Sequence, residues 1–316
     1  MSDLETRAPA AEGPVGAPRP IASGGEASSL TLLERMRRYQ RAFAHLDGPF
    51  AFVDLDAMWS NSAAMLARAG GKPIRVASKS LRCRELIGDV LGSDDRYRGV
   101  LSFTLPEALW LAGNGFEDVL VAYPSTDRAA LRALAARTAE RPDTAPVVMV
   151  DSVEHLDLID AAVGRPEAPL RVCLDFDASF WLRGRLKIGP KRTPVHAPSQ
   201  ALQLARAIAA RSSLKLVGMM CYEGHIAGVG DLVRGNPAKS ALIRRVQRAS
   251  YEELRDRRAQ AVAQVSSVCE LEFVNAGGTG DLERVATEPA ITEATAGSGF
   301  YAPTLFDNYS AFSLEP

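Results

Sequence analysis

Eight short apolar runs follow one another from residue 74 onward, and segments with helical patterns separate most of them. The runs show little alternation between apolar and polar residues, which is typical of parallel strands buried on both faces. They lie at residues 74–78, 99–103, 118–122, 147–151, 170–175, 214–221, 272–276 and 291–296. Eight such units over about 250 residues predict one α/β domain, a (β/α)8 barrel of the TIM type. A doubly wound sheet is the rival fold, but the Gly-rich turn that usually follows its first strand is absent here.

The segment before this pattern differs from it in composition. Residues 1–28 are rich in Ala, Pro, Gly and Ser and predict a disordered tail. Residues 29–47 predict an N-terminal helix. The barrel is expected to occupy residues 48–300, with an additional strand over residues 50–54. The longest predicted helix, residues 237–267, is expected to carry its many arginines on the solvent side.

Charge and cysteine content narrow the range of partners and compartments. The 316 residues include 37 Lys and Arg against 38 Asp and Glu, a formal net charge of −1. This balance gives no electrostatic support for a nucleic acid or an anionic membrane as partner, and no apolar run approaches the ~20 residues of a membrane helix. The four cysteines lie far apart without a CxxC pair, so neither a zinc site nor a disulfide framework is indicated. A reducing cytoplasm fits this pattern best.

Polar and glycine residues collect where the predicted strands end. In a barrel of this type the active site lies at the C-terminal ends of the strands, so these residues are the candidates for chemistry. The candidates are Lys79 after the first run, Tyr222 and His225 after the sixth, Asn275 near the end of the seventh with Gly277, Gly278, Thr279 and Gly280 after it, and Ser298 and Gly299 after the eighth.

Lys79 closes the first buried run. A lysine at an apolar barrel mouth loses solvation of its ammonium group, so its pKa falls and it can form a Schiff base with a carbonyl compound. A lysine that extends to solvent is the alternative interpretation.

The glycine residues around Thr279 and Ser298 predict close approach of the backbone to a ligand. Backbone N–H groups in the loops after strands seven and eight of such barrels often bind a phosphate. Ordinary turns are the alternative. His225 can titrate near neutrality and relay a proton, and Tyr222 offers a ring face or a phenol. A histidine satisfied in packing is the alternative for His225.

Residues 178–197, after the fifth run, carry Arg183, Arg185, Lys187, Lys191 and Arg192 without any Asp or Glu. These cations can attract a carboxylate or a phosphate. A solvated loop or a subunit contact is the alternative interpretation.

In combination, these features resemble the fold-type III pyridoxal phosphate enzymes, a group that includes the alanine racemases. Residues 49–56 (PFAFVDLD), 222–225 (YEGH), 277–280 and 291–299, followed by Phe306-Asp307, are more specifically similar to the D-threonine aldolase and D-serine dehydratase branch. Some members of that branch are called amino acid deaminase/aldolase. The resemblance covers about residues 48–310.

The resemblance implies a role for each candidate. Lys79 would form the Schiff base with pyridoxal 5'-phosphate, and Gly277, Gly278, Thr279 and Ser298 would hold its phosphate. Tyr222 and His225 would lie near the pyridoxal ring, with His225 as the better candidate for a base. Either Arg185 or Arg192, near Asp175, would correspond to the Asp-and-Arg motif of strand five and bind substrate. A homodimer is also implied.

The function that the resemblance implies is a pyridoxal phosphate-dependent lyase or deaminase acting on D-hydroxy amino acids. Members of this branch take a His-x-Cys or His-x-Asp metal pair from a second β domain, of which residues 301–316 would be the truncated beginning. A divalent metal is therefore expected only with that missing domain, no metal ligand is expected in this chain, and weak or no turnover is expected of this chain alone. Two alternatives stay open, a pyridoxal phosphate homeostasis protein and a cofactor-free aldolase in which Lys79 reacts with sugar phosphates.

Overall fold

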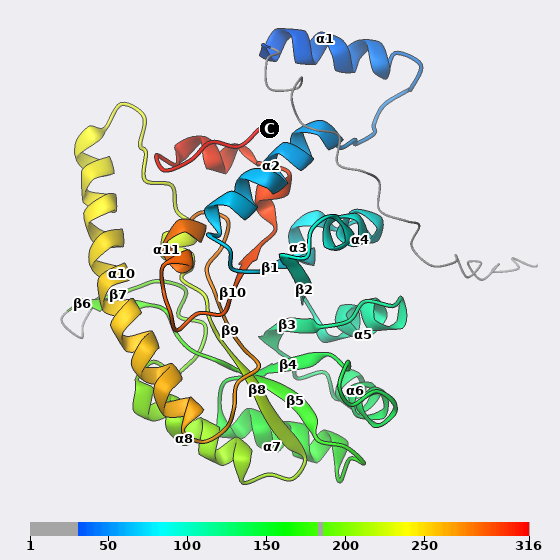
Figure 1. The fold of residues 1–316 in the computed structure, drawn as a ribbon, viewed down its shortest axis with the longest axis vertical. Coiled ribbons are helices and arrows are strands. Elements are labelled where there is room, and N and C mark those ends of the chain that lie inside the picture. Colours follow the sequence, from blue (N-terminus) through cyan, green and yellow to red (C-terminus); the bar gives the residue numbers. More distant parts are fainter. Residues whose placement is uncertain (1–30, 183–185, 316) are drawn as a thin grey trace, which may run out of the picture.

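The computed structural model describes residues 31–182 and 186–315 of the chain. Eight parallel strands close into a barrel with the order β1-β10-β9-β8-β5-β4-β3-β2 (Figure 1). The barrel strands are β1 (Ile74–Ala77), β2 (Tyr97–Ser102), β3 (Val119–Pro124), β4 (Val147–Val150), β5 (Leu170–Asp175), β8 (Leu214–Cys221), β9 (Phe273–Ala276) and β10 (Glu293–Ala296). All eight predicted strands are present within a few residues of their expected bounds, and the predicted fold class is confirmed.

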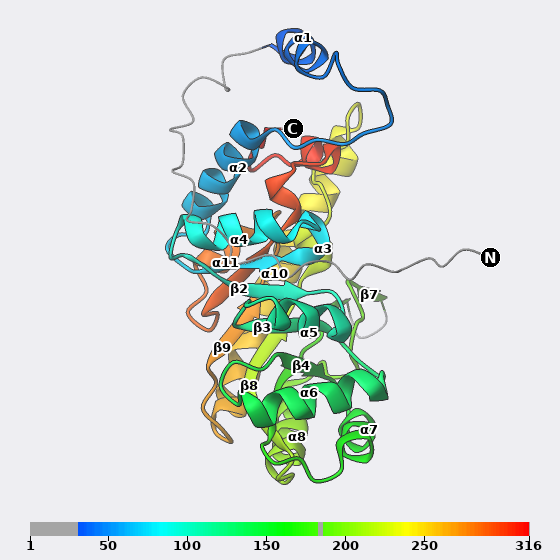
Figure 2. The ribbon, with the colours of Figure 1, turned by 90° about the vertical axis from the view of Figure 1, so that its right-hand side faces the viewer.

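Helices surround the barrel on its outer side (Figures 1 and 2). They are α2 (Leu55–Arg68), α3 (Ser78–Leu81), α4 (Arg84–Ser93), α5 (Leu105–Gly113), α6 (Arg128–Glu140), α7 (Val153–Val163), α8 (Pro198–Ala209), α9 (Gly224–Ala227), α10 (Pro237–Ser266) and α11 (Leu282–Ala286). Side-chain oxygens cap several of the helix starts: Thr104 accepts from the N–H of Glu107, and Ser152 accepts from that of His155. These caps satisfy backbone donors that have no partner within the helix.

Burial on both faces explains why the strands lack alternation. In β3, Val119 and Val121 belong to the large cluster between barrel and helices, whereas Leu120 belongs to a second cluster. Successive strand residues point to opposite faces, so this second cluster fills the inside of the barrel. Its buried members are Leu120, Val147, Met149, Cys173, Val217, Met220 and Phe273. Both sides of each strand are therefore buried, and most positions on each side require apolar residues.

The N-terminal region follows the prediction only in part. Helix α1 (Leu32–Ala42) begins with a capping box and lies beyond α2 at one end of the molecule (Figures 1 and 2). The additional strand predicted over residues 50–54 is wrong, because the segment has no strand pairing. A closed barrel offers it no free edge; Phe52 instead packs on Tyr39 and Phe43 of the α1 region, and Asp54 caps α2. The tail predicted over residues 1–28 lies outside the described residues.

Residues after β10 fold back onto the barrel. Two short 3-10 helices, η2 (Ser298–Phe300) and η3 (Thr304–Asn308), follow the last strand. Phe306, Tyr309 and Phe312 pack on one another, and the Tyr309 hydroxyl donates to the carbonyl oxygen of Ala227 at 3.0 Å. That residues 301–316 begin a β domain stays a prediction.

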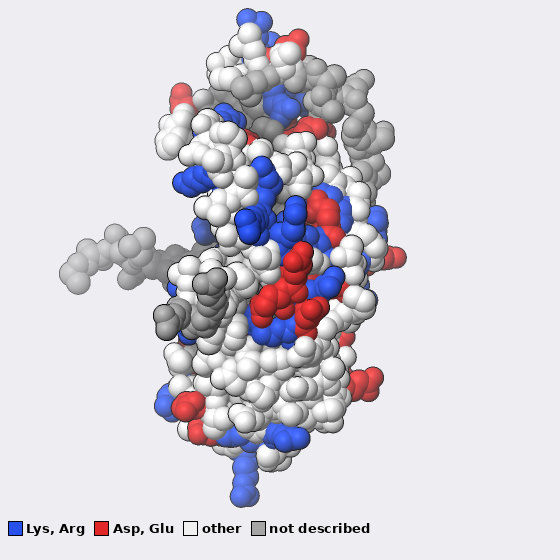
Figure 3. Space-filling view, turned by 90° about the vertical axis from the view of Figure 1, so that its left-hand side faces the viewer, with Lys and Arg blue, Asp and Glu red and all other residues white. Residues whose placement is uncertain are grey.

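The structure differs from the prediction in the segment after β5 and in the arginines of α10. The segment after β5 contains a small antiparallel hairpin, β6 (Phe180–Leu182) with β7 (Leu186–Ile188). On the α10 side of the molecule, basic and acidic side chains adjoin one another (Figure 3). On α10 itself, Arg255 pairs with Asp256 at 3.4 Å. The prediction that the arginines of α10 lie on the solvent side is wrong for Arg257 and Arg258, which are buried.

All four cysteines are free thiols. Among the described residues, no helix combines the length and the apolar character that crossing a membrane requires.

Candidate active site

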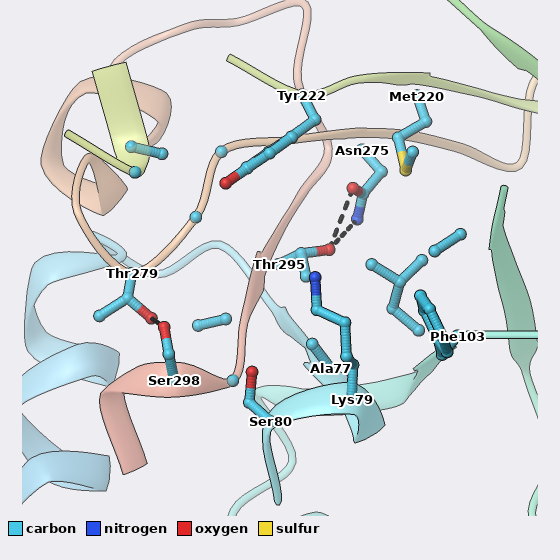
Figure 4. A pocket seen from close by; sticks show the side chains of 18 of the residues that line it. Ala77, Lys79, Ser80, Phe103, Met220, Tyr222, Asn275, Thr279, Thr295 and Ser298 are labelled. Carbon is cyan, nitrogen blue, oxygen red and sulfur yellow. Dashed lines mark hydrogen bonds between the residues drawn. The ribbon is translucent and has the colours of Figure 1, made fainter. Parts of the chain in front are cut away.

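A cavity of about 210 Å³ lies at the C-terminal ends of the barrel strands. Its walls come from β1, β2, β3, β8, β9 and β10, from the loops that follow them, and from Arg192 in the segment after β5 (Figure 4). The predicted site residues that line it are Lys79, Arg192, Tyr222, Asn275, Gly277, Gly278, Thr279 and Ser298. These residues come from the ends of five strands, β1, β5, β8, β9 and β10, or from the segments that follow them, and they meet in one place.

Lys79 directs its amine into the middle of this cavity, toward Thr295 (Figure 4). The chain passes from β1 directly into the single turn α3, which aims the side chain across the barrel mouth. The left-handed backbone of Arg82, with φ of 52°, ends this turn. The Lys79 side chain is exposed, which corrects the expectation of an amine held away from water.

A pair of hydroxyl groups lies on another wall of the cavity (Figure 4). The Oγ1 atom of Thr279 and the Oγ atom of Ser298 are 3.4 Å apart. The N–H of Gly299 donates to Oγ1 of Thr279 at 3.1 Å, which ties the loop after β9 to the loop after β10. Gly299 does not itself appear among the described lining residues.

We call residues 277–280 the glycine loop. The N–H of Gly277 donates to Oε2 of Glu223 at 2.9 Å, and the N–H of Gly278 donates to Oδ1 of Asp281 at 2.8 Å. Both acceptors are buried. The expectation that these two amides bind a phosphate is therefore corrected, because carboxyl groups behind the loop already engage them.

The glycines serve instead to bring backbone close to neighbouring groups. Gly277 has φ of +75°, a conformation that other residues rarely adopt. A Cβ atom on Gly280 would lie 2.1 Å from the carbonyl oxygen of Ala227. Gly280 is thus a packing residue and does not appear among the described lining residues.

Tyr222 presents its ring to the cavity beside the glycine loop (Figure 4). A Cβ atom on Gly278 would lie 3.3 Å from Cε2 of this ring, so glycine is what permits the contact. Burial raises the pKa of the Tyr222 phenol to about 12. The phenol is therefore protonated at neutral pH and can act as a hydrogen-bond donor.

The structure places His225 away from the cavity. It lies on α9, its Nε2 atom contacts the hydroxyl of Ser250 on α10 at 2.5 Å, and it is not among the described lining residues. Burial lowers the pKa of His225 below its ordinary value. This geometry corrects the expectation that His225 lies near the reacting ring, and it favours the alternative of a histidine satisfied in packing.

Arg192 reaches the cavity from the segment after β5. Its guanidinium lies 4.5 Å from the ring centre of Tyr123 and 5.9 Å from that of Tyr222, and it pairs with Asp175 at 3.5 Å. Of the two arginines that the sequence left open, Arg192 lies in the cavity wall. Arg185 lies outside the described residues.

Asp175 is fully buried beneath Arg192, and burial raises its pKa to about 7 despite the nearby guanidinium. Since the folded-state pKa exceeds the unfolded value, the folded chain keeps a proton that the unfolded chain loses as pH rises. The contribution of Asp175 to the free energy of unfolding therefore falls as the pH rises from about 4 to about 7.

We expect Asp175→Asn to remove this pH dependence. Relative to the variant, the wild-type free energy of unfolding should fall by about 4 kcal/mol between pH 4 and pH 8. Urea unfolding of both proteins across this range measures the difference. A constant difference at all pH values would contradict the raised pKa of Asp175.

A chain of hydrogen bonds runs down the barrel interior below the cavity. The side chain of Asn275 contacts Thr295 at 2.8 Å and Oε1 of Glu293 at 2.8 Å, and Glu293 pairs with the buried Arg75 at 2.7 Å. Asn275 is thereby fixed in orientation at the cavity floor. Sequence reasoning missed Thr295, Glu293 and Arg75, although the polar positions within β1 and β10 were a readable signal.

Among the residues that the structure describes, no three His, Cys, Asp or Glu side chains lie together in a way that could hold a metal ion.

Comparison with known proteins extends these observations. Residues 53–303 match the protein family described as the alanine racemase N-terminal domain. The fold is similar to D-threonine aldolase from Filomicrobium marinum, with a TM-score of 0.69 at 21% identity over 86% of this chain and 68% of that one. It is also similar to D-threo-3-hydroxyaspartate dehydratase from Delftia sp. HT23, with a TM-score of 0.64 at 23% identity over 85% and 65% of the two chains.

A more distant similarity joins the chain to an arginine decarboxylase from Paramecium bursaria Chlorella virus, with a TM-score of 0.56 at 12% identity over 85% and 68% of the two chains. The chain thus spans about two thirds of the length of each of these proteins. None of the curated proteins matches the sequence.

Proposed function

Since the chain belongs to the alanine racemase N-terminal domain family, we propose that it binds pyridoxal 5'-phosphate covalently through Lys79 and acts on amino acids. The observation that carries the proposal is the direction of the Lys79 amine, which points into the cavity at the C-terminal end of the barrel. A lysine amine in that place is the group that bonds to the aldehyde of such a cofactor.

The residues around the cavity fit the cofactor's chemistry. Thr279 and Ser298 present hydroxyl groups that suit a phosphate, on a wall separate from Lys79. Asn275 and Tyr222 can contact a flat ring between these two ends. Gly297 lets the loop after β10 pack closely on the end of β1, because a Cβ atom on Gly297 would lie 2.7 Å from that of Ala77.

The proposed chemistry divides between the cofactor and the chain. When bound, pyridoxal phosphate accepts the electrons released as a bond to the substrate's α-carbon breaks. Arg192 would bind the substrate carboxylate and so fix which α-carbon bond faces the ring. The Lys79 amine would be the cavity group placed to carry a proton to or from the α-carbon. The Tyr222 phenol would hold its proton and donate a hydrogen bond.

For the substrate we propose D-amino acids with a β-hydroxyl group, and for the reaction a lyase or deaminase step. The support is the likeness to structures named D-threonine aldolase and D-threo-3-hydroxyaspartate dehydratase. The homodimer and the cytoplasmic location stay predictions.

Titration with pyridoxal 5'-phosphate, followed by visible absorbance, tests the proposal. Wild-type protein should develop a new absorbance band that saturates at one cofactor per chain, and Lys79→Ala should not. Lys215→Ala is the matched control, because that lysine lies at the start of β8 with a side chain 60% exposed, and it should behave as wild type.

The outcomes separate the alternatives. A protein without a new absorbance band, in which Lys79 instead reacts with a sugar phosphate, would point to the cofactor-free aldolase. Saturable cofactor binding without turnover of any amino acid would favour the homeostasis protein.

A further inference from the structure

Two buried carboxyl groups lie directly behind the glycine loop. Glu223 and Asp281 are 0% and 1% exposed, and each accepts one backbone N–H of the loop. Glu223 comes from the end of β8, and Asp281 follows the loop itself. The loop is therefore fastened from behind by side chains that do not line the cavity.

Glu223 is also part of a buried ion network. Its Oε1 atom accepts from Arg258 of α10 at 2.9 Å, while the same guanidinium pairs with Glu288, after α11. All three side chains are at most 1% exposed. An ion group buried this fully keeps its geometry only if its hydrogen bonds are made, so Arg258 fixes the position of Glu223.

One of the two carboxyl groups behind the loop adds little negative charge there. Burial raises the pKa of Asp281 well above its usual range, which favours the neutral acid, whereas Glu223 shares the single positive charge of Arg258 with Glu288. The Oδ2 atom of Asp281 has no hydrogen-bond partner, whereas Oδ1 holds the Gly278 amide. A neutral carboxyl beside the loop does not repel a phosphate.

We propose that Glu223 and Asp281 are positioning residues that make the cavity selective for the phosphorylated form of the cofactor. By holding the amides of Gly277 and Gly278, they fix the loop so that the Thr279 hydroxyl stands 3.4 Å from that of Ser298. This inference rests on the proposed function. Lys79 lies on a different element, the turn after β1, so bonding to an aldehyde does not depend on the loop.

Two substitutions at Asp281 distinguish the effect of its hydrogen bond with Gly278 from the effects of its size and charge. Asp281→Asn can keep a carbonyl oxygen toward Gly278 and place its NH₂ where Oδ2 lacks a partner. Asp281→Ala removes the acceptor. Glu223→Gln is an independent variant, because its NH₂ group would replace one of the two oxygens that accept from Gly277 and Arg258.

Each protein is titrated with pyridoxal 5'-phosphate and with pyridoxal, which lacks the phosphate, and thermal unfolding shows that the variants fold. We expect Asp281→Ala and Glu223→Gln to weaken pyridoxal phosphate binding about 10-fold with pyridoxal binding unchanged. Asp281→Asn should stay within about 2-fold of wild type for both compounds.

Equal weakening of both compounds, or no weakening of either, would overturn the inference and leave the proposed function standing. Wild-type protein that binds both compounds equally well would also overturn the inference and leave the proposed function standing, because the cavity would then have no subsite for the phosphate. Wild-type protein that binds neither would overturn the proposed function, and the inference with it.

Discussion

Arg258→Met should lower the free energy of unfolding by about 3 to 5 kcal/mol, the cost of removing one partner from a buried ion pair. The guanidinium is fully buried between Glu223 and Glu288, and its loss leaves two carboxylates without a counterion or a route to water. That is a large part of the 5 to 15 kcal/mol by which domains are typically stable. Urea unfolding monitored by circular dichroism measures it.

Arg255→Met is the matched control on the same helix. Arg255 pairs with Asp256 at the surface, where both side chains are more than half exposed, so its removal should change stability by less than about 1 kcal/mol. Adding Glu223→Leu and Glu288→Leu to Arg258→Met should recover much of the lost stability, because no charge is then left unpaired. An Arg258→Met protein as stable as the Arg255→Met control would show that the network has no such role.

Lys79→Ala should reduce turnover of a D-hydroxy amino acid by about 10³-fold or more, since one side chain serves as both covalent attachment and proton carrier. The cavity would keep its hydroxyl wall and Arg192, so substrate and cofactor could still enter it. Steady-state kinetics with added pyridoxal phosphate measures the loss.

Lys79→Arg distinguishes a covalent role from a role of charge. Arginine keeps a positive charge at the same position but is always protonated and neither bonds to the aldehyde nor takes up a proton. We therefore expect it to be as inactive as Lys79→Ala. Activity within about 10-fold of wild type in the arginine variant would mean that Lys79 acts only as a cation.

The barrel could be predicted because one physical requirement acts on all eight strands. Each is covered by helices on one side and by the barrel interior on the other, so each run is mostly apolar, with exceptions such as Arg75, Asn275 and Glu293. Residues 50–54 met the same apolar criterion, yet a closed barrel has no free edge to pair with them. Local composition does not contain that information.

The sequence predicts which residues come close together at the site, but not the direction of each side chain or its hydrogen bonds. Parallel strands bring Lys79 and the glycine loop to one rim whatever the loops do. The direction of a side chain after the strand depends on the turn that follows, and the short α9 turns His225 toward Ser250. The hydrogen bond from the N–H of Gly277 to Glu223 could not be predicted either, because it joins residues that lie 54 positions apart in the sequence.

Borohydride reduction of the protein with pyridoxal 5'-phosphate, followed by digestion and mass spectrometry, tests most directly where the cofactor bonds. The reduction converts a reversible bond between lysine and aldehyde into a stable one, so the modified peptide names the residue. We predict a single modified peptide, the one that contains Lys79. An unmodified Lys79, or a modification on another lysine alone, would contradict the assignment of this cavity as the cofactor site.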